Sequence, residues 1–155
     1  MSTIRQAVPQ DLQAINRLLG EVLRVHHELR PDLFRPEGKK YTDVELLALF
    51  ANPLTPVFVF EDSAQVEGYI FCELQHFDSG SMVPRTTLYI DDLCVSPSAR
   101  RKGVARALYS KAEDFARKNG CHNITLHVWE GNSAALSLYK SLGMTPQYTS
   151  MEVVL

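Results

Sequence analysis

The spacing of apolar residues predicts helices and strands that alternate along the chain. Residues 3–7 alternate weakly between apolar and polar side chains, which favours a short first strand. From residue 9 to about residue 29 the apolar side chains recur every three or four positions, the period of a helix with one buried face. Pro31 ends this helix, and the proline-containing segment 30–40 is expected to form an irregular loop.

The middle of the chain changes to a β-type pattern. Thr42 and Glu45 have the spacing of a capping box, so a short helix should run from there to about residue 51. Two runs rich in aromatic and β-branched residues, 55–61 and 66–75, are separated by a short polar turn and predict a hairpin. A polar loop over 77–85 then leads into a further strand that ends near residue 95.

The last third returns to helices and ends in strands. An apolar stripe over 104–118 predicts a helix packed on the sheet, and alternation over 123–129 predicts a fifth strand. A helix should begin at Asn132 or Ser133 and end at Gly143, and the tail 145–155 is expected to add one or two closing strands. The order β-α-α-β-β-β-α-β-α-β predicts an α/β fold, with a mixed sheet flanked by helices on both faces.

Length and charge limit the architecture and the partners. With 155 residues, of which 45% are hydrophobic and 22% charged, the chain should form one domain over 1–155. A formal charge of −2 gives no overall attraction to nucleic acid or to an anionic membrane, so we expect neither as a partner. We also expect a cytoplasmic protein, because no signal segment or bilayer-spanning run is present.

The reactive side chains give no sign of a disulfide framework or a metal site. Cys72, Cys94 and Cys121 are odd in number and lie in or beside apolar runs, which indicates reduced thiols. The five histidines lack metal-ligand spacing with these cysteines, so we assign no metal.

The segment that follows the strand 88–95 has the features of an anion site. Arg100, Arg101 and Lys102 directly precede Gly103 and the start of the helix over 104–118. The first N–H groups of a helix have no partner within the helix and favour negative charge, and a glycine lets the backbone approach a phosphate closely. An ordinary solvated face is the alternative for the three cations. Neither G-x-G-x-x-G nor G-x-x-x-x-G-K-[ST] is present.

The pattern Arg100-x-x-Gly103-x-Ala105 resembles the Q/R-x-x-G-x-G/A signature of the GNAT superfamily of acetyl-CoA-dependent N-acetyltransferases. The strand "YIDDLCV" before it and the later segment "NSAALSLYKSLGM" are similar to further segments of that family. The three matches stand in the family's order and spacing.

The resemblance implies how acetyl-CoA would be bound. The backbone of Leu93 and Val95, with Cys94 between them, would pair with the pantetheine arm, and the Leu93 N–H would point at the thioester oxygen. The family's fourth and fifth strands splay apart to admit this arm. The remaining cofactor contacts would be diphosphate contacts from the loop and the helix start, made by Arg100, Arg101, Lys102, Gly103, Val104, Ala105 and Arg106.

The same resemblance assigns the chemistry. Tyr139 matches the tyrosine that protonates the coenzyme A thiolate, although on its own pattern it would be a core tyrosine. Asn132 matches an asparagine near the pantetheine and is also suited to cap a helix. Asp91 and Asp92 are the candidate general bases, or else solvent-facing carboxylates. Neighbouring strand residues point to opposite faces, so only one should reach the acceptor; we favour Asp91, which matches a common glutamate position.

The predicted function is transfer of an acetyl group from acetyl-CoA to a primary amine by direct attack in a ternary complex. The acceptor could be a small molecule, a peptide or a protein, and a homodimer is possible. Acidic residues around the cleft, Glu21, Glu28 and Glu73 among them, would favour a cationic amine. Two alternatives remain open, a non-catalytic acyl-CoA-binding module and a nucleotide-binding protein that uses the same helix terminus.

Overall fold

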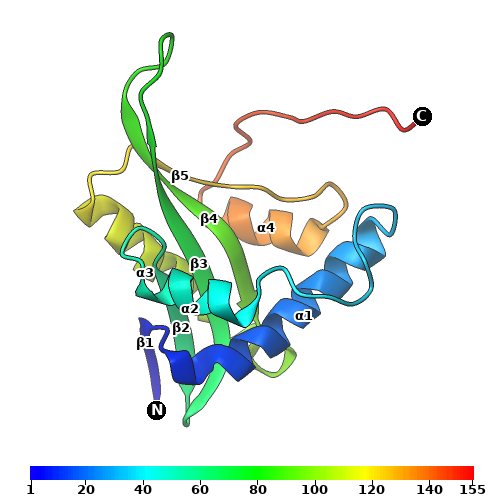
Figure 1. The fold of residues 1–155 in the computed structure, drawn as a ribbon, viewed down its shortest axis with the longest axis vertical. Coiled ribbons are helices and arrows are strands. Elements are labelled where there is room, and N and C mark those ends of the chain that lie inside the picture. The colour runs from blue at the N-terminus through cyan, green and yellow to red at the C-terminus, as the bar shows by residue number, and fades with distance from the viewer.

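A five-stranded sheet forms the centre of the computed structural model, which describes residues 1–155 (Figure 1). The strands are β1 (Ser2–Gln6), β2 (Val57–Asp62), β3 (Gln65–Phe77), β4 (Arg85–Val95) and β5 (Asn123–Leu126), and they follow one another across the sheet in that order. The first four pair antiparallel, whereas β5 runs parallel to β4. The predicted α/β class with a mixed, mostly antiparallel sheet is confirmed.

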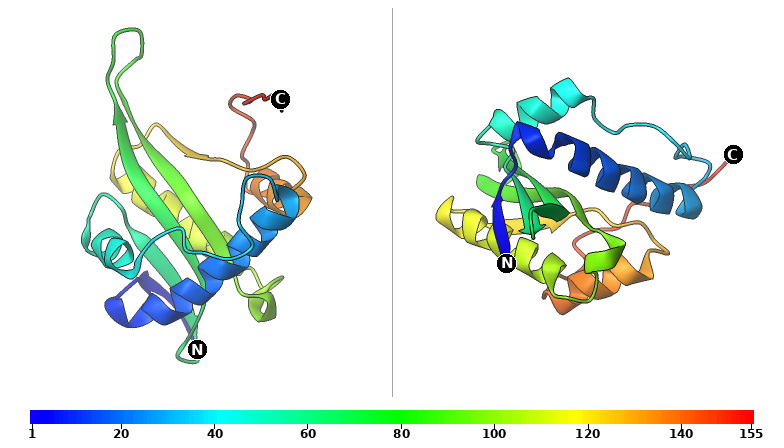
Figure 2. Two further views of the ribbon diagram at one scale, coloured as in Figure 1. Left: turned by 45° about the vertical axis from the view of Figure 1, so that its right-hand side comes forward. Right: turned by 90° about the horizontal axis from the view of Figure 1, so that it is seen from below.

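Helices cover both faces of the sheet, as the view from below shows (Figure 2). Helices α1 (Leu12–Leu29) and α2 (Asp43–Ala51) lie on one face, and α3 (Val104–Lys118) and α4 (Ser133–Ser141) lie on the other. Each face has its own apolar core, one including Ile15, Leu18 and Tyr69, the other including Ile70 and Leu108. None of the helices combines the length and the apolar character that crossing a membrane requires.

The local signals read from the sequence account for most element boundaries. The Thr42 hydroxyl accepts a hydrogen bond from the Glu45 N–H, and the Glu45 carboxylate accepts one from the Thr42 N–H, so the capping box of α2 is formed. The β2–β3 hairpin turns through Ser63 and Ala64, both with positive φ. Gly120 and Gly143, at φ values of 66° and 90°, follow the ends of α3 and α4.

Strand β4 extends beyond the end of its neighbour β5, where the two chains separate. Their pairing ends at Ile90 opposite Leu126, while β4 continues to Val95. The prediction of a strand as far as residue 129 was therefore wrong. Trp129 instead packs edge-on against Phe34, with ring centroids 5.6 Å apart, beyond the C-terminal end of α1. This packing accompanies the separation of the chain from β4, and the splay that the family resemblance implied is present.

The expected closing strands are absent. Residues 145–155 have no regular structure, are exposed throughout, and extend away from the body of the molecule (Figure 1). A strand needs a hydrogen-bonded neighbour, and the tail has none along β5. Side chains position it instead, through the ion pair of Arg30 with Glu152 at 2.6 Å and the contact of the Tyr148 hydroxyl with His127 at 3.1 Å.

A β-bulge interrupts the regular alternation of β4. Phe71 of β3 pairs with Asp92 and Cys72 pairs with Ile90, so Asp91 is an extra residue with no partner across the ladder. On one side of the bulge Ile90 faces the core under α3, and on the other side Cys94 faces the core under α1 and α2. The bulge thus reverses which face the residues of β4 present.

Candidate functional site

The loop between β4 and α3 holds its backbone in an unusual conformation. Arg101 and Gly103 both adopt left-handed φ values, 62° and 77°, and Gly103 is the N-cap residue of α3. Turns that alternate right-handed and left-handed residues point successive N–H groups into one concavity, a geometry that binds anions. Arg101 is costly in this conformation because it has a Cβ atom, whereas Gly103 is not.

The N–H groups of this loop are available to a ligand. None of the backbone N–H groups of residues 101–106 donates a hydrogen bond to another part of the chain, and the first intrahelical bond runs from Ala107 to Gly103. The positive end of the α3 dipole lies at the same place. The geometry therefore provides the oriented donors that a diphosphate requires.

Of the four cations in the loop and the first turn of α3, two contact other parts of the chain and two do not. The Arg100 side chain donates a hydrogen bond to the carbonyl of Val95, with Nε 3.3 Å from the oxygen. Arg106, in the first turn of α3, donates one to the hydroxyl of Ser141, the last residue of α4, at 3.3 Å. Arg101 and Lys102 form no ion pair within the chain and are exposed. Arg100 thus ties the loop to the end of β4 and Arg106 ties α3 to α4, whereas Arg101 and Lys102 remain free to attract a polyanion.

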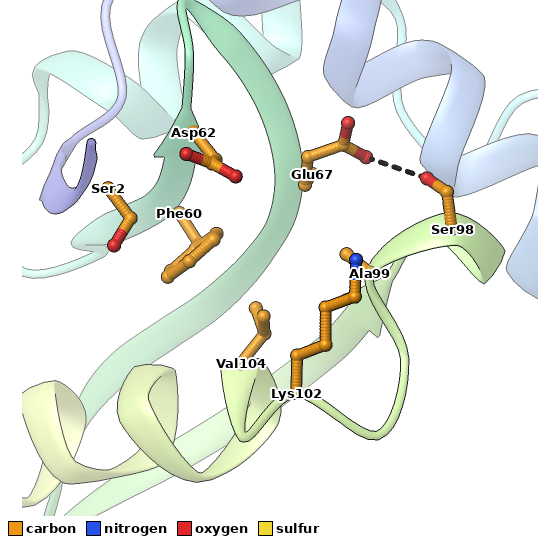
Figure 3. A pocket seen from close by; sticks show the side chains of 8 residues that line it. All are labelled: Ser2, Phe60, Asp62, Glu67, Ser98, Ala99, Lys102 and Val104. Carbon is orange, nitrogen blue, oxygen red and sulfur yellow. Dashed lines mark hydrogen bonds between the residues drawn. The ribbon is translucent and has the colours of Figure 1, made fainter.

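A cavity of about 380 Å³ adjoins the outer side of this loop (Figure 3). Glu67 of β3 lines it and accepts hydrogen bonds from the hydroxyls of Ser96 and Ser98, which fix the loop to the sheet. Lys102 also borders it, but none of the residues predicted to contact the thioester does. The cavity is therefore not the place where acetyl transfer would occur.

The end of β4 presents an open backbone edge on its β5 side. Residues 93–95 pair with β3 on one side, through Ile70 opposite Leu93 and Gly68 opposite Val95. On the other side they have no strand partner, because β5 pairs only as far as Ile90. An extended chain can add to such an edge by strand-like hydrogen bonds.

Both aspartates lie on the α1 and α2 side of the sheet, so the expectation that only one could do so was wrong. Tyr41 donates a 2.5 Å hydrogen bond to Asp91, and Tyr69 donates a 2.9 Å hydrogen bond to Asp92. Alternation predicts opposite faces, but the bulge at Asp91 removes it for this pair. The two carboxylates therefore occupy one acidic site.

The two carboxylates differ in their electrostatic environments. Burial raises the pKa of Asp92 to about 6, against the lowering effects of Lys40 and of the Tyr69 hydroxyl. A hydrogen bond from the backbone N–H of Leu93 to the Asp92 carboxylate also lowers this pKa, so that N–H lies beside the carboxylate. Asp91 is 22% exposed and its Oδ2 atom is 3.1 Å from the ammonium of Lys40. Asp92 thus has a pKa close to neutral pH, whereas Asp91 forms an ion pair with Lys40.

Tyr139 and Cys94 share the environment of Asp92. Burial raises the pKa of Tyr139 to about 12, and the charge of Asp92 contributes to the rise. Burial also raises the pKa of Cys94 to about 12, and its thiol donates to the carbonyl of Leu18 at 3.7 Å. Tyr139 is therefore a protonated hydroxyl at neutral pH. Cys94 behaves as a small buried apolar side chain and is not an activated nucleophile.

Comparison with known proteins gives the family. The model of the Acetyltransferase (GNAT) family matches residues 22–144. An uncharacterized N-acetyltransferase of Bacillus subtilis, YhfO, is 32% identical over 141 residues, which cover 90% of this chain and 87% of that one. The chain belongs to the GNAT acetyltransferase family. The crystal structure of a mutant form of a Bacillus halodurans protein superimposes on this GNAT chain with a TM-score of 0.95 and 30% identity, and it covers 99% of both chains.

Other relatives match only part of the GNAT chain or share only its fold. Thialysine N-epsilon-acetyltransferase of Bos taurus is 34% identical over 56 residues, covering 36% of this chain and 33% of that one. An aminoglycoside N-acetyltransferase solved in complex with CoA has a TM-score of 0.73 at 16% identity, which is a likeness of fold.

Helix α4 carries the two remaining residues that the GNAT resemblance singled out. Asn132 is the N-cap of α4, and its side chain accepts a hydrogen bond from the Ala135 N–H at 3.2 Å. The capping alternative is thus confirmed, and its contact with pantetheine stays a prediction. Tyr139 is partly buried and donates no hydrogen bond within the chain. Its hydroxyl is therefore not committed to a structural role.

Three residues of this site were missed from the sequence. Tyr41 and Lys40 lie at the end of the loop before α2, and Tyr69 is fully buried in β3. Tyr41 also stacks on Phe71, with ring centroids 6.1 Å apart and the planes 5° from parallel. Nothing in the local pattern marks these residues, because only the fold brings residue 41 to residue 91.

Proposed function

We propose that this GNAT domain transfers the acetyl group of acetyl-CoA to a primary amine by direct attack within a ternary complex. The observation that carries the proposal is that Asp92, at the open end of β4, lies near enough to Tyr139 for its charge to raise the pKa of that hydroxyl. One group suits proton removal and the other suits proton donation. The unpartnered N–H groups of residues 101–106 fit the diphosphate of the coenzyme.

Acetyl-CoA, when bound, supplies an acetyl group activated as a thioester. The open edge at residues 93–95 would align the pantetheine arm, and the Leu93 N–H would stabilise the negative charge that develops on the carbonyl oxygen. Removing one donor of this kind typically costs about a hundredfold or more in rate. Asp92 is the base that the geometry supports best, although the sequence favoured Asp91, because Asp91 is engaged by Tyr41 and Lys40.

Proton transfers complete the reaction. A carboxylate with a pKa of about 6 is ionised at neutral pH and accepts a proton from the attacking amine, directly or through one water. As the carbon–sulfur bond breaks, the Tyr139 hydroxyl gives its proton to the departing thiolate. The thiol of Cys94 is too weak an acid to take part at neutral pH, so no acetyl-enzyme intermediate is needed.

The charge around the site favours a cationic acceptor. Asp91 and Asp92 lie on the same side of the sheet, and Glu21 of α1 has a buried Oε2 atom without a hydrogen-bond partner in the chain. Relatives named for acetylation of thialysine and of methionine sulfoximine act on acceptors that carry an amine. An alkyl ammonium of modest size is the acceptor class that these carboxylates support.

A thiol-release assay tests the proposal. The purified protein is incubated with acetyl-CoA and a panel of amines, amino acids, aminoglycosides and lysine-containing peptides, and free coenzyme A is measured. We expect release that depends on the acceptor and is greatest with cationic amines. Tight binding of acetyl-CoA by calorimetry without release on any acceptor would instead indicate a non-catalytic acyl-CoA-binding module. Preference for ATP over acetyl-CoA would contradict the assignment of the loop.

A further inference from the structure

We propose that Lys40 is itself an acceptor, acetylated within its own chain at the acidic site formed by Asp91 and Asp92. The inference rests on the proposed acetyl transfer and adds a modification site to it. Lys40 is the only amine of the chain that pairs with either aspartate.

Contacts place the Lys40 amine beside the proposed reaction centre. Its Nζ atom is 3.1 Å from Asp91 Oδ2 and 5.5 Å from the centroid of the Tyr41 ring. Its charge also acts on Asp92, the next residue, whose carboxylate lies beside the Leu93 N–H. The amine is thus next to the same backbone segment along which the thioester would lie.

The neighbouring residue anchors Lys40 in this position. The Tyr41 hydroxyl donates a 2.5 Å hydrogen bond to Asp91, and the Tyr41 ring stacks on Phe71 of β3. Only the flexible four-carbon side chain of Lys40 separates this anchor from its amine. An amine tethered in this way is present at a high effective concentration, which accelerates a reaction even when the amine is an ordinary lysine.

Lys39 provides a built-in comparison. Its Nζ atom is 3.0 Å from the carboxylate of Asp43, which is in the first turn of α2. Lys39 therefore pairs with a carboxylate outside the acidic site. The two side chains are similarly accessible, 56% exposed for Lys39 and 46% for Lys40. Chemical acetylation by free acetyl-CoA should therefore label both, whereas acetylation by the site should select Lys40.

The reaction balances as an ordinary acetyl transfer. The Lys40 ammonium loses one proton to the acidic pair, which passes it to solvent, and its nitrogen forms a bond to the carbonyl carbon. The nitrogen loses a second proton to solvent as the carbon–sulfur bond breaks. Tyr139 protonates the thiolate and is reprotonated from solvent, so the products are Nε-acetyl-lysine, coenzyme A and one proton released to solvent. The product is neutral, so it cannot keep the ion pair with Asp91. Acetylation would thereby free Asp91 for the ammonium of an external acceptor.

Peptide mass spectrometry tests the proposal. The protein is incubated with isotopically labelled acetyl-CoA and no acceptor, and acetyl incorporation at Lys39 and Lys40 is followed over time at several protein concentrations. We expect Lys40 to be labelled at least about tenfold faster than Lys39, at a rate per molecule that does not change with protein concentration. The Asp92→Asn variant should lose the labelling of Lys40 and keep the slow labelling of Lys39.

The possible outcomes separate this inference from the proposed function. Equal labelling of the two lysines, or a rate that rises with protein concentration, would overturn acetylation within the chain. Acetylation of an external amine without labelling of Lys40 would overturn the inference and leave the proposed function standing. Failure of both reactions would remove the proposed function as well. A Lys40→Arg variant keeps a cation opposite Asp91 and should lose the fast labelling, while the slow labelling of Lys39 remains.

Discussion

The two halves of the site are built in different ways. The half proposed for the coenzyme consists of backbone N–H groups and an open strand edge, contributed by the continuous stretch from β4 to the start of α3. The half proposed for the acceptor consists of side chains from the loop before α2, from β3 and from the bulge in β4. Backbone donors keep their character when most side chains change, whereas carboxylates depend on neighbours and on pH. Substitutions should therefore affect the halves unequally.

The largest effect is expected from Asp92→Asn in the acceptor half. Loss of the general base should lower kcat by at least about a hundredfold. The wild-type rate should also fall below about pH 6, as the carboxylate becomes protonated, and the variant should lack this dependence. Initial rates of thiol release across the pH range measure both effects.

Asp91→Asn is the matched control, because it removes the neighbouring charge of the same site. It should weaken acceptor binding and leave the acidic limb of the pH profile in place. An equal loss of kcat in the two variants would contradict the assignment of the base to Asp92.

The same Asp92→Asn substitution should stabilise the fold. The pKa of about 6 is above the ordinary aspartate value, so the folded chain binds this proton more tightly than the unfolded chain. The charged carboxylate therefore destabilises the folded chain. This destabilisation is absent below about pH 4 and grows as the pH rises to about 6. At pH values above about 7 the variant should gain about 2 to 3 kcal/mol in the free energy of unfolding. Urea denaturation at several pH values measures the gain, and a gain independent of pH would contradict its electrostatic origin.

Tyr139→Phe tests the connection between the halves. Without the hydroxyl the thiolate must leave unprotonated, so we expect kcat to fall by about ten- to a hundredfold. The KM for acetyl-CoA should hardly change, since the hydroxyl makes no contact with the proposed diphosphate site. A rise in that KM with unchanged kcat would indicate that Tyr139 packs against the coenzyme and donates no proton. Tyr109→Phe, on α3 in the core between this helix and the sheet, is a control for loss of a phenol hydroxyl elsewhere.

The smallest of these effects is expected in the coenzyme half, from Gly103→Ala. No atom obstructs an added methyl group, but the φ of 77° disfavours it, by about 1 kcal/mol. The N–H groups should move slightly out of alignment, which raises the KM for acetyl-CoA by about tenfold or less. Steady-state kinetics measure this change. Gly80→Ala, in an open loop without a left-handed φ, should leave it unaltered.

The coenzyme half of the site could be predicted from the sequence, whereas much of the acceptor half could not. The loop over 96–106 could be recognised because its determinants are consecutive in the sequence, and the capping box at Thr42 is equally local. The role of Tyr41 could not, because it depends on the contact with residue 91. The face of Asp92 was mispredicted since alternation carries no sign of a bulge, and β-type composition alone wrongly suggested strands in the tail 145–155.

The extra residue at Asp91 adds a carboxylate to the site without changing the rest of the strand. If Asp91 were deleted, Asp92 would follow Ile90 directly, and the remaining pairs of β4 with β3 would be unchanged. Asp92 and Cys94 would keep the faces that they have now, and the strand would lose the carboxylate that contacts Tyr41 and Lys40. A single lost codon could then leave a folded protein that keeps the proposed base and releases the side chain of Lys40.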